Sequence, residues 1–206
     1  MITPDLERWN ERFSSEDYLF GTAPNAFLAR QRHLLHLGQR ALAIADGEGR
    51  NGVWLAEQGL DVLSIDFSPV ALKKAGRLAA SRGVVLKTQK ADLESWMWEP
   101  ERFDVVAAIF IQFARPALRA AIFEGIKLTL APGGLLLLQG YRPEQLRYGT
   151  GGPPHAENMY TAEMLRSAFE DFEILHLAEH DSVVSEGRGH DGMSALVDLV
   201  ARKPGK

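Results

Sequence analysis

A glycine-rich stretch from Gly47 to Gly52, with the sequence GEGRNG, is the part of this 206-residue chain whose residue types and spacing most directly suggest chemistry. It matches the G-x-G-x-x-G pattern of dinucleotide-binding turns, and an acidic residue, Asp66, follows at about the expected distance. A glycine-rich turn after any buried strand would produce the same pattern. The stretch therefore indicates a nucleotide-type ligand but does not by itself identify one.

The charged side chains of this stretch distinguish two classes of nucleotide. A dinucleotide such as NAD places its pyrophosphate on the positive N-terminal end of the following helix, where Asp46 and Glu48 would repel it. S-adenosylmethionine (SAM) has no phosphate. Its sulfonium and ammonium groups suit acidic neighbours, and its carboxylate suits backbone N–H groups and Arg50. Because glycines also let the backbone approach a ligand closely, the turn favours SAM.

Further cofactor contacts are expected at the ends of neighbouring strands. The Asp66 carboxylate could accept hydrogen bonds from both ribose hydroxyls, and Asp92, after a third strand, could accept one from the adenine amino group. Ile109 ends a fourth strand and could line the methionine part. The alternatives are a helix-terminal role for Asp66, a loop role for Asp92 and core packing for Ile109. The predicted cofactor-binding residues are Ala45, Asp46, Gly47, Gly49, Asp66, Phe67, Asp92, Leu93 and Ile109.

The elements that must position these residues alternate regularly between positions 41 and 140. Short apolar runs predict buried strands, and periodic segments that begin at Ser-Pro or end at glycine predict helices. The predicted strands are 41–45, 62–65, 84–88, 103–110 and 135–138, and the predicted helices are 50–58, 68–81 and 118–130. This alternation predicts an α/β fold, a Rossmann-like αβα sandwich that binds ligands at the carboxyl ends of its parallel strands.

The two ends of the chain are less regular. Residues 1–36 predict one or two helices, broken at Gly21 and Pro24, that could form a lid over the strand ends. Beyond position 140 we expect a helix over 161–170 and two strands over 172–177 and 195–201. They would complete a mostly parallel seven-stranded sheet with an antiparallel C-terminal strand. We therefore expect a single domain over 1–206, with a lid (1–36), a nucleotide-binding core (41–140) and a substrate-side region (141–206).

Composition narrows the chemistry further. The chain has no cysteine, which excludes disulfides, zinc–thiolate sites, iron–sulfur clusters and cysteine nucleophiles. A net charge of −4 without a cluster of Lys and Arg argues against nucleic-acid and membrane partners. The longest apolar runs, 105–111 and 135–138, are too short to span a bilayer, and the acidic N-terminus lacks a signal-peptide core, which predicts a cytoplasmic protein. His176 and His180 have no second ligand pair, so no metal site is expected.

The residues that would bind the methyl acceptor follow from the chemistry of methyl transfer. Methyl transfer from a sulfonium is an in-line displacement that depends mainly on positioning and on exclusion of water, and a base is needed only for a protonated acceptor. Loops after the fifth strand offer Tyr148 as an aromatic wall, Arg142 as an anion site and His155 as a proton acceptor, and the last loop offers His190. Surface loops are rich in such residues. Tyr148, His155 and His190 are therefore weak candidates, and no catalytic residue is assigned.

With these residues in place, the chain resembles the class I SAM-dependent methyltransferases, and within them the branch of tellurite-resistance and thiopurine methyltransferases. The shared motifs, in the correct order over nearly the whole chain, are WNERF (9–13), YLFGTAPN (18–25), GEGRN (47–51), DFSP (66–69), LAPGG (130–134) and EGRGHDG (186–192). The chain departs from the wider pattern at Ala43, where relatives carry an acid, at Ala45, where they carry glycine, and at Gln112, where some carry histidine. Asp46 could make the contact to the SAM ammonium group that Ala43 cannot.

The resemblance implies an enzyme that uses SAM to methylate a small molecule: a thiol, a chalcogen oxyanion or an amine. A monomer or homodimer without nucleic-acid or membrane partners is expected. A non-catalytic SAM-binding module and an NAD-dependent oxidoreductase are the alternatives, and an RNA or protein methyltransferase is disfavoured by the charge of the chain. The motifs alone do not identify the acceptor.

Overall fold

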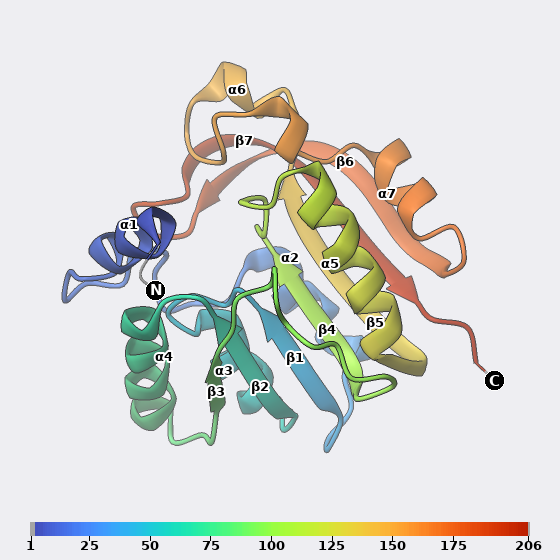
Figure 1. The fold of residues 1–206 in the computed structure, drawn as a ribbon, viewed down its shortest axis with the longest axis horizontal. Helices are drawn as coiled ribbons and strands as arrows, with labels where there is room; N and C mark the ends of the chain where they lie inside the picture. The colour runs from blue at the N-terminus through green and yellow to red at the C-terminus, as the bar shows by residue number, and fades with distance from the viewer. Residues whose placement is uncertain (1–2, 206) are drawn as a thin grey trace. The chain divides into compact units, whose positions relative to one another are not determined.

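The computed structural model describes residues 3–205. Its strands are β1 (Arg40–Ile44), β2 (Asp61–Asp66), β3 (Lys87–Lys90), β4 (Phe103–Ile109), β5 (Leu130–Tyr141), β6 (Glu173–Ser185) and β7 (Asp191–Arg202). They form a seven-stranded sheet of order β3-β2-β1-β4-β5-β7-β6 (Figure 1). The pairs β1–β2, β2–β3 and β4–β5 are parallel, whereas β7 runs antiparallel to both β5 and β6. The predicted α/β fold, a mostly parallel seven-stranded sheet with an antiparallel C-terminal strand, is therefore confirmed.

Four of the helices within residues 3–205 begin at a capping side chain. The helices are α1 (Pro4–Arg12), α2 (Ala26–Arg30), α3 (Arg50–Glu57), α4 (Pro69–Arg82), α5 (Pro116–Thr129), α6 (Gln145–Tyr148) and α7 (Ala162–Ala168), with 3-10 turns at Gln31–Leu34 and Ala156–Asn158. Thr3, Asn25, Ser68 and Thr161 each accept a hydrogen bond from the backbone N–H three residues later, at the starts of α1, α2, α4 and α7. No helix among residues 3–205 has the length and apolar character needed to cross a membrane.

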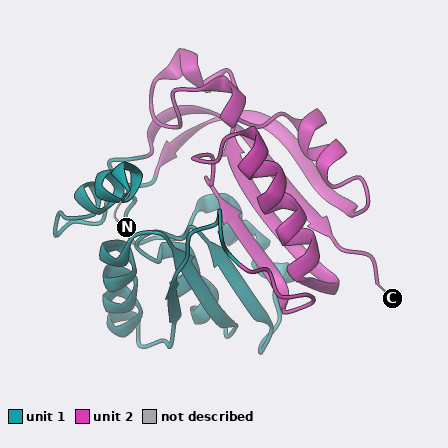
Figure 2. Cartoon of the chain, in the orientation of Figure 1, with its two compact units in different colours: residues 1–96, 186–189 teal, residues 97–185, 190–206 magenta. Residues whose placement is uncertain are grey.

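The chain divides into two compact units (Figure 2). Unit 1 contains the residues up to Trp96 together with Glu186–Gly189, and unit 2 contains Met97–Ser185 and the residues from His190 onward. The short stretch Glu186–Gly189 thus belongs to unit 1, although the strands on either side of it in the chain, β6 and β7, belong to unit 2.

Unit 1 is built on the parallel ladder β3-β2-β1. β1 and β2 are buried beyond their first residues, as expected of apolar strands in a parallel sheet. Val53 of α3 packs against Leu78 and Ala79 of α4 in one buried cluster. Gly49, directly before α3, permits this close packing, because a Cβ there would lie 2.5 Å from the Cβ of Ala75 in α4.

β3 begins later than the apolar residues predict, at Lys87 rather than at position 84. Gly83 ends α4 in the left-handed conformation, with φ of 69°, and the N–H of Val84 still donates to the carbonyl of Ala79 in the last helical turn. Val84 and Leu86 then pack on the cluster of α3 and α4. The end of the helix therefore uses the apolar residues that suggested a strand.

Unit 2 is built on the strand order β4-β5-β7-β6, and its last two strands are longer than predicted. β6 and β7 pair from Glu173↔Arg202 to Ser185↔Asp191, well beyond the predicted 172–177 and 195–201. Most side chains of β6 are exposed or half-buried, so this edge strand lacks the apolar run that marks a buried one.

The helix–strand junction in unit 2 also differs from the prediction. α5 begins at Pro116 rather than at position 118, with proline in its first turn. β5 begins directly after α5, at Leu130 rather than at position 135, because the segment Ala131–Gly134 is accommodated within the strand. Gly133 has a left-handed φ of 76°, and its N–H donates to the carbonyl of Lys203 at 3.0 Å. The segment Ala131–Gly134 therefore produces a register shift in the pairing of β5 with β4, between Phe103 and Val105, instead of separating the strand from the helix.

Candidate cofactor site

The carboxyl end of β1 leads into the glycine turn through left-handed backbone. Ala45, Gly47 and Gly49 have φ values of 47°, 59° and 88°. Glycine adopts this conformation readily, whereas an L-residue such as Ala45 loses about 1 kcal/mol in it. Ala45 therefore adopts the backbone of the glycine that the resemblance expects at its position. Strain of this kind is common where a chain forms a ligand site.

Asp46 directs its buried carboxylate into unit 1, where two groups of the protein already bind it. Its Oδ2 accepts hydrogen bonds from Gly52 N at 3.0 Å and from Ser64 Oγ at 2.8 Å. Burial raises its pKa to about 7, although these two hydrogen bonds act in the opposite direction. The Asp46 carboxylate thus caps α3 and ties that helix to β2, and its contact to the SAM ammonium group in place of an acid at Ala43 stays a prediction.

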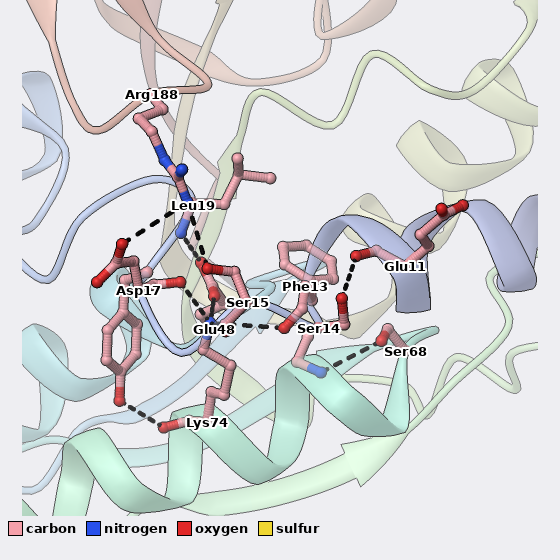
Figure 3. A network of polar contacts seen from close by, with 12 residues as sticks. Glu11, Phe13, Ser14, Ser15, Asp17, Leu19, Glu48, Ser68, Lys74 and Arg188 are labelled. Carbon is pink, nitrogen blue, oxygen red and sulfur yellow. Dashed lines mark hydrogen bonds and ion pairs between the residues drawn. The ribbon is translucent and has the colours of Figure 1, made fainter.

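Glu48 is also engaged within the protein (Figure 3). Its carboxylate forms an ion pair with the Lys74 ammonium group and accepts a hydrogen bond from Leu19 N at 2.7 Å. Only 2% of the Glu48 side chain and 6% of the Lys74 side chain are exposed. Because Lys74 neutralises Glu48, this acid neither repels a pyrophosphate nor attracts a cation in the way that the charge argument from the sequence requires.

The same ammonium group fixes the segment from Phe13 to Leu19, which we call the strap (Figure 3). Lys74 Nζ donates to the carbonyl oxygens of Ser15 at 2.8 Å and Asp17 at 2.7 Å. The ring of Phe13 lies on the glycine turn, since a Cβ on Gly47 would be 3.5 Å from its Cζ. The strap therefore lies over the glycine turn, with the ring of Phe13 against Gly47.

Asp66 approaches the turn from the end of β2. Its Oδ2 accepts a hydrogen bond from Gly47 N and its Oδ1 accepts one from Ser68 N, both at 2.8 Å. Burial raises the pKa of Asp66 to about 6, against the opposing effect of these hydrogen bonds. The backbone N–H of Phe67 also acts on this carboxylate, and because a carboxylate has about four lone-pair sites, Asp66 can still accept a further hydrogen bond. The tertiary structure thus joins Asp66, at the end of β2, to Gly47 of the glycine turn, and its contact to the ribose hydroxyls stays a prediction.

The loop after β3 lies beside the end of β2, because Ala91 N donates to the carbonyl of Asp66 at 2.9 Å. Asp92 is exposed, and its Oδ1 accepts a hydrogen bond from Glu94 N at 3.0 Å, which forms a local turn. Leu93 is half-buried. The placement of Asp92 suits either the predicted adenine contact or the loop role that was its alternative.

The remaining predicted cofactor residues also follow strand ends. Phe67 comes directly after β2 and is half-buried. Ile109 is the last residue of β4 in unit 2, and its side chain is buried. The residues of unit 1 thus gather at the carboxyl ends of β1, β2 and β3, where open α/β sheets bind ligands.

A buried ion pair between Arg50 and Glu186 was not predicted from the sequence. Arg50 Nη2 lies 2.6 Å from Glu186 Oε2. Glu186 Oε1 also accepts hydrogen bonds from Asn25 Nδ2 at 3.1 Å and from Ala26 N at 3.0 Å. The paired residues are 136 positions apart, so no local pattern reveals them. The only sequence signal was the shared motif over 186–192, which named the segment but not its partner.

Two of the weak acceptor-side candidates lie on the surface of unit 2. The Tyr148 hydroxyl donates to Asp181 at 2.9 Å, and the same carboxylate pairs with Arg142. The hydrogen bond to Asp181 raises the pKa of the Tyr148 hydroxyl. His155 is exposed. Tyr148 and Arg142 thus share one carboxylate partner, and Arg142 is already neutralised as an anion site.

His190 is buried among aromatic rings of unit 2. Its ring centroid is 4.4 Å from that of Phe110 and 5.8 Å from that of Tyr141, both in edge-on arrangements. Phe110 follows β4 with a left-handed φ of 54°. The Gln112 amide bridges the backbone of Tyr141, donating to its carbonyl at 2.7 Å and accepting from its N–H at 2.6 Å. At the position where some relatives carry histidine, Gln112 therefore supports the backbone of β5.

Comparisons with known proteins agree with this geometry. Residues 41–134, which include the glycine turn and Asp66, match a family model described as a methyltransferase domain. An uncharacterized protein of Mycobacterium tuberculosis is 33% identical over 100 residues, which cover 48% of this chain and 36% of that protein. The glycine/sarcosine N-methyltransferase of Aphanothece halophytica is 27% identical over 190 residues, covering 84% of this chain and 68% of that protein. The chain thus spans about a third of the length of the mycobacterial relative.

Two solved structures share the fold. The N-methyltransferase NodS of Bradyrhizobium japonicum, in complex with S-adenosyl-L-homocysteine (SAH), has a TM-score of 0.73 at 15% identity, covering 98% of this chain and 100% of that chain. TehB of Haemophilus influenzae has a TM-score of 0.72 at 16% identity, covering 96% of this chain and 66% of that chain. These two likenesses show the fold of the chain, and within that fold the glycine turn and Asp66 lie in the segment that matches the methyltransferase-domain model.

Proposed function

We propose that this chain transfers a methyl group from SAM to a small-molecule acceptor. The observation that carries the proposal is the junction of Gly47 and Asp66. It joins the glycine turn to the acid at the end of β2 through a hydrogen bond of 2.8 Å, within the segment matched by the methyltransferase model. The NAD-dependent alternative is disfavoured only by the match to the methyltransferase model. The charge argument against a pyrophosphate does not apply, because Lys74 neutralises Glu48.

The chain's own residues fit the cofactor. SAM, when bound, supplies a methyl group on a sulfonium, which needs no further activation. Asp66 has lone pairs available for the ribose hydroxyls, and the left-handed turn from Ala45 to Gly49 offers backbone groups without intervening Cβ atoms at Gly47 and Gly49. The strap over the turn supports the proposal further, because a covered site excludes water.

Among the three predicted acceptor classes, an amine has the best support. The relative that aligns over 84% of this chain is named a glycine/sarcosine N-methyltransferase, and NodS is named an N-methyltransferase. An amine loses a proton during methylation, so it benefits from a nearby proton acceptor. His190, in its aromatic cluster, is the residue we propose for that role. The tellurite-resistance and thiopurine branch, with chalcogen or thiol acceptors, is the second candidate, supported by the fold of TehB.

The test combines binding with turnover. The protein is titrated calorimetrically with SAH and NAD, and then incubated with methyl-labelled SAM and amines (glycine and sarcosine first), thiols, selenite and tellurite. We expect SAH to bind, NAD not to bind, and label to reach an amine. Label in thiols or chalcogens alone would support the second candidate. SAH binding without any transfer would indicate a non-catalytic SAM-binding module, and binding of NAD alone would contradict the proposal.

A further inference from the structure

The ring of Phe13 closes one side of the glycine turn. Only 3% of Phe13 is exposed, and a Cβ on Gly47 would lie 3.5 Å from its Cζ and 3.8 Å from its Cε1. Trp9 stacks on this ring with 5.4 Å between the centroids, and Phe20 meets it edge-on at 6.3 Å. These rings fill the space next to Gly47, so a ligand that uses this face of the turn must displace Phe13.

The helix before the strap reaches the side of the site that carries Asp66. Ser68 Oγ donates a hydrogen bond of 2.6 Å to Asn10 Oδ1 in α1, and Ser68 N donates to the Asp66 carboxylate. Ser68 precedes α4 and Lys74 lies within it, so this one helix holds the N-terminal segment at two points (Figure 3). The N-terminal segment therefore touches Gly47 on one side of the junction and Ser68, which binds Asp66, on the other.

One buried ion pair connects the strap to the glycine turn. The Lys74 ammonium group donates to the strap carbonyls of Ser15 and Asp17. It also pairs with Glu48, which belongs to the turn and accepts a hydrogen bond from Leu19 N at the end of the strap. We call Lys74 and Glu48 the latch. Because both members of the latch bind the strap, the strap leaves the turn only when these contacts break.

Between its ends the strap has little apolar contact with the protein. Residues 14–17 are exposed, and Tyr18 and Leu19 are half-buried. A segment with few buried apolar contacts opens at a lower free energy than the core. The far end is held, because Leu19 O accepts a hydrogen bond from Gly189 N at 3.1 Å and a Cβ on Gly187 would lie 2.5 Å from the same oxygen. The strap is thus a short segment that can detach between two held ends.

We propose that the strap is a gate over the glycine turn and that the Lys74–Glu48 latch sets the rate at which an adenosyl ligand enters and leaves. The inference rests on the proposed function and gives a kinetic role to two residues outside the predicted cofactor contacts. Loss of one charge-assisted hydrogen bond shifts a local opening equilibrium by about tenfold or more. The latch bonds only to the protein, so it stabilises the closed strap equally with and without a ligand. Entry and exit both pass through the open strap, so a weaker latch accelerates both and leaves the affinity nearly unchanged.

Stopped-flow kinetics with SAH, followed through tryptophan fluorescence, test the latch. Wild type is compared with the double variant Glu48→Gln/Lys74→Met and with the control Lys73→Met, at an exposed position of α4. We expect the double variant to bind and to release SAH at least tenfold faster than wild type, with a Kd within threefold, and the control to match wild type. Unchanged rates would overturn the inference. Faster release alone, with a proportionally weaker Kd, would overturn it too, because damage to the glycine turn gives that result.

A reversible tether tests the gate without altering the buried pair. Arg188 Nη2 donates to Ser15 Oγ at 3.4 Å, and both residues are exposed. Because the chain has no cysteine, the variant Ser15→Cys/Arg188→Cys can be joined by a bis-methanethiosulfonate linker and released by reduction. We expect the tethered protein to release preloaded SAH at least tenfold more slowly than the same protein after reduction. Equal release rates would overturn the inference, whereas failure of wild type to bind SAH would contradict the proposed function on which it rests.

Discussion

Asp46 couples the protonation of a single carboxyl group to the stability of unit 1. Its pKa in the folded protein is about 7, because burial disfavours the charge more than the hydrogen bonds from Gly52 and Ser64 favour it. An exposed aspartate titrates near pH 4, so between about pH 4 and 7 the folded state holds a proton that the unfolded state releases. This contribution to stability is therefore complete below about pH 4 and is lost as the pH rises through about 7.

We predict that Asp46→Asn gains stability relative to wild type as the pH rises from 5 to 8, because asparagine cannot ionise. Its oxygen can still accept from Gly52 N, and its amide can donate to the Ser64 hydroxyl. Since one pKa unit corresponds to about 1.4 kcal/mol, the difference in unfolding free energy should grow by roughly 2–3 kcal/mol. Urea denaturation at pH 5, 6, 7 and 8 measures it. A difference that stays constant over this range would show that burial does not raise the pKa of Asp46.

Asp66 gives a second prediction for a single residue. Asp66→Asn should weaken SAH binding at least tenfold, because the amide offers one acceptor oxygen instead of two and its NH2 group opposes a backbone N–H of Gly47 or Ser68. The matched control is Asp61→Asn, at the exposed start of the same strand, where the carboxylate pairs with Lys87. Calorimetry measures both affinities. If the two variants bind SAH equally well, Asp66 has no part in the ribose site.

At the scale of elements, the strap depends on one buried ammonium group. We predict that Lys74→Met destabilises the protein by about 3 kcal/mol or more, because it leaves the buried Glu48 carboxylate without its cation. The backbone amides of residues 13–19 should exchange with deuterium faster, since the ammonium donors to the carbonyls of Ser15 and Asp17 are lost. Lys73→Met, the exposed neighbour on α4, is the control for both measurements.

The double variant Glu48→Gln/Lys74→Met distinguishes the effect of the unpaired Glu48 charge from the effect of losing the hydrogen bonds that hold the strap. It buries no unpaired charge, so part of the stability lost in Lys74→Met should return. The strap should still exchange quickly, because its carbonyl oxygens remain without the ammonium donors. Slow exchange in both variants would show that the strap is held by other contacts, such as the ring of Phe13 on the glycine turn.

At the scale of the whole molecule, binding of the cofactor should raise the free energy of unfolding of the protein. A ligand that binds only the folded state adds about 2.7 kcal/mol at a hundredfold excess over its Kd. For a chain of 206 residues this corresponds to a rise in Tm of about 5–10 °C. We predict this rise with SAH and none with NAD at equal concentration, measured by calorimetric melting. A rise with NAD alone would favour the oxidoreductase alternative.

The elements that the sequence predicts best are those of the first unit. Apolar runs and helix caps lie within a few residues of the structure they produce, so β1, β2, α3 and α4 appear close to their predicted bounds. The predicted length of β6 was too short, because its side chains are largely exposed and give no apolar pattern. The strand is defined by its pairing with β7. Pairing with a second strand, rather than local periodicity, extends it to Ser185.

For this protein, the sequence by itself determined the alternation of strands and helices, the glycine turn and the acid at Asp66, because each depends on backbone preferences of adjacent residues. Only the tertiary structure decided what the charged side chains do. Asp46 and Glu48, which favoured SAM as free acids, are bound to Ser64 and Lys74. Arg50 forms an ion pair with Glu186, which lies 136 positions later in the chain. A buried charge needs a partner of opposite charge, and the fold decides which residue lies close enough to be that partner. The spacing of residues along the chain therefore does not predict the pair.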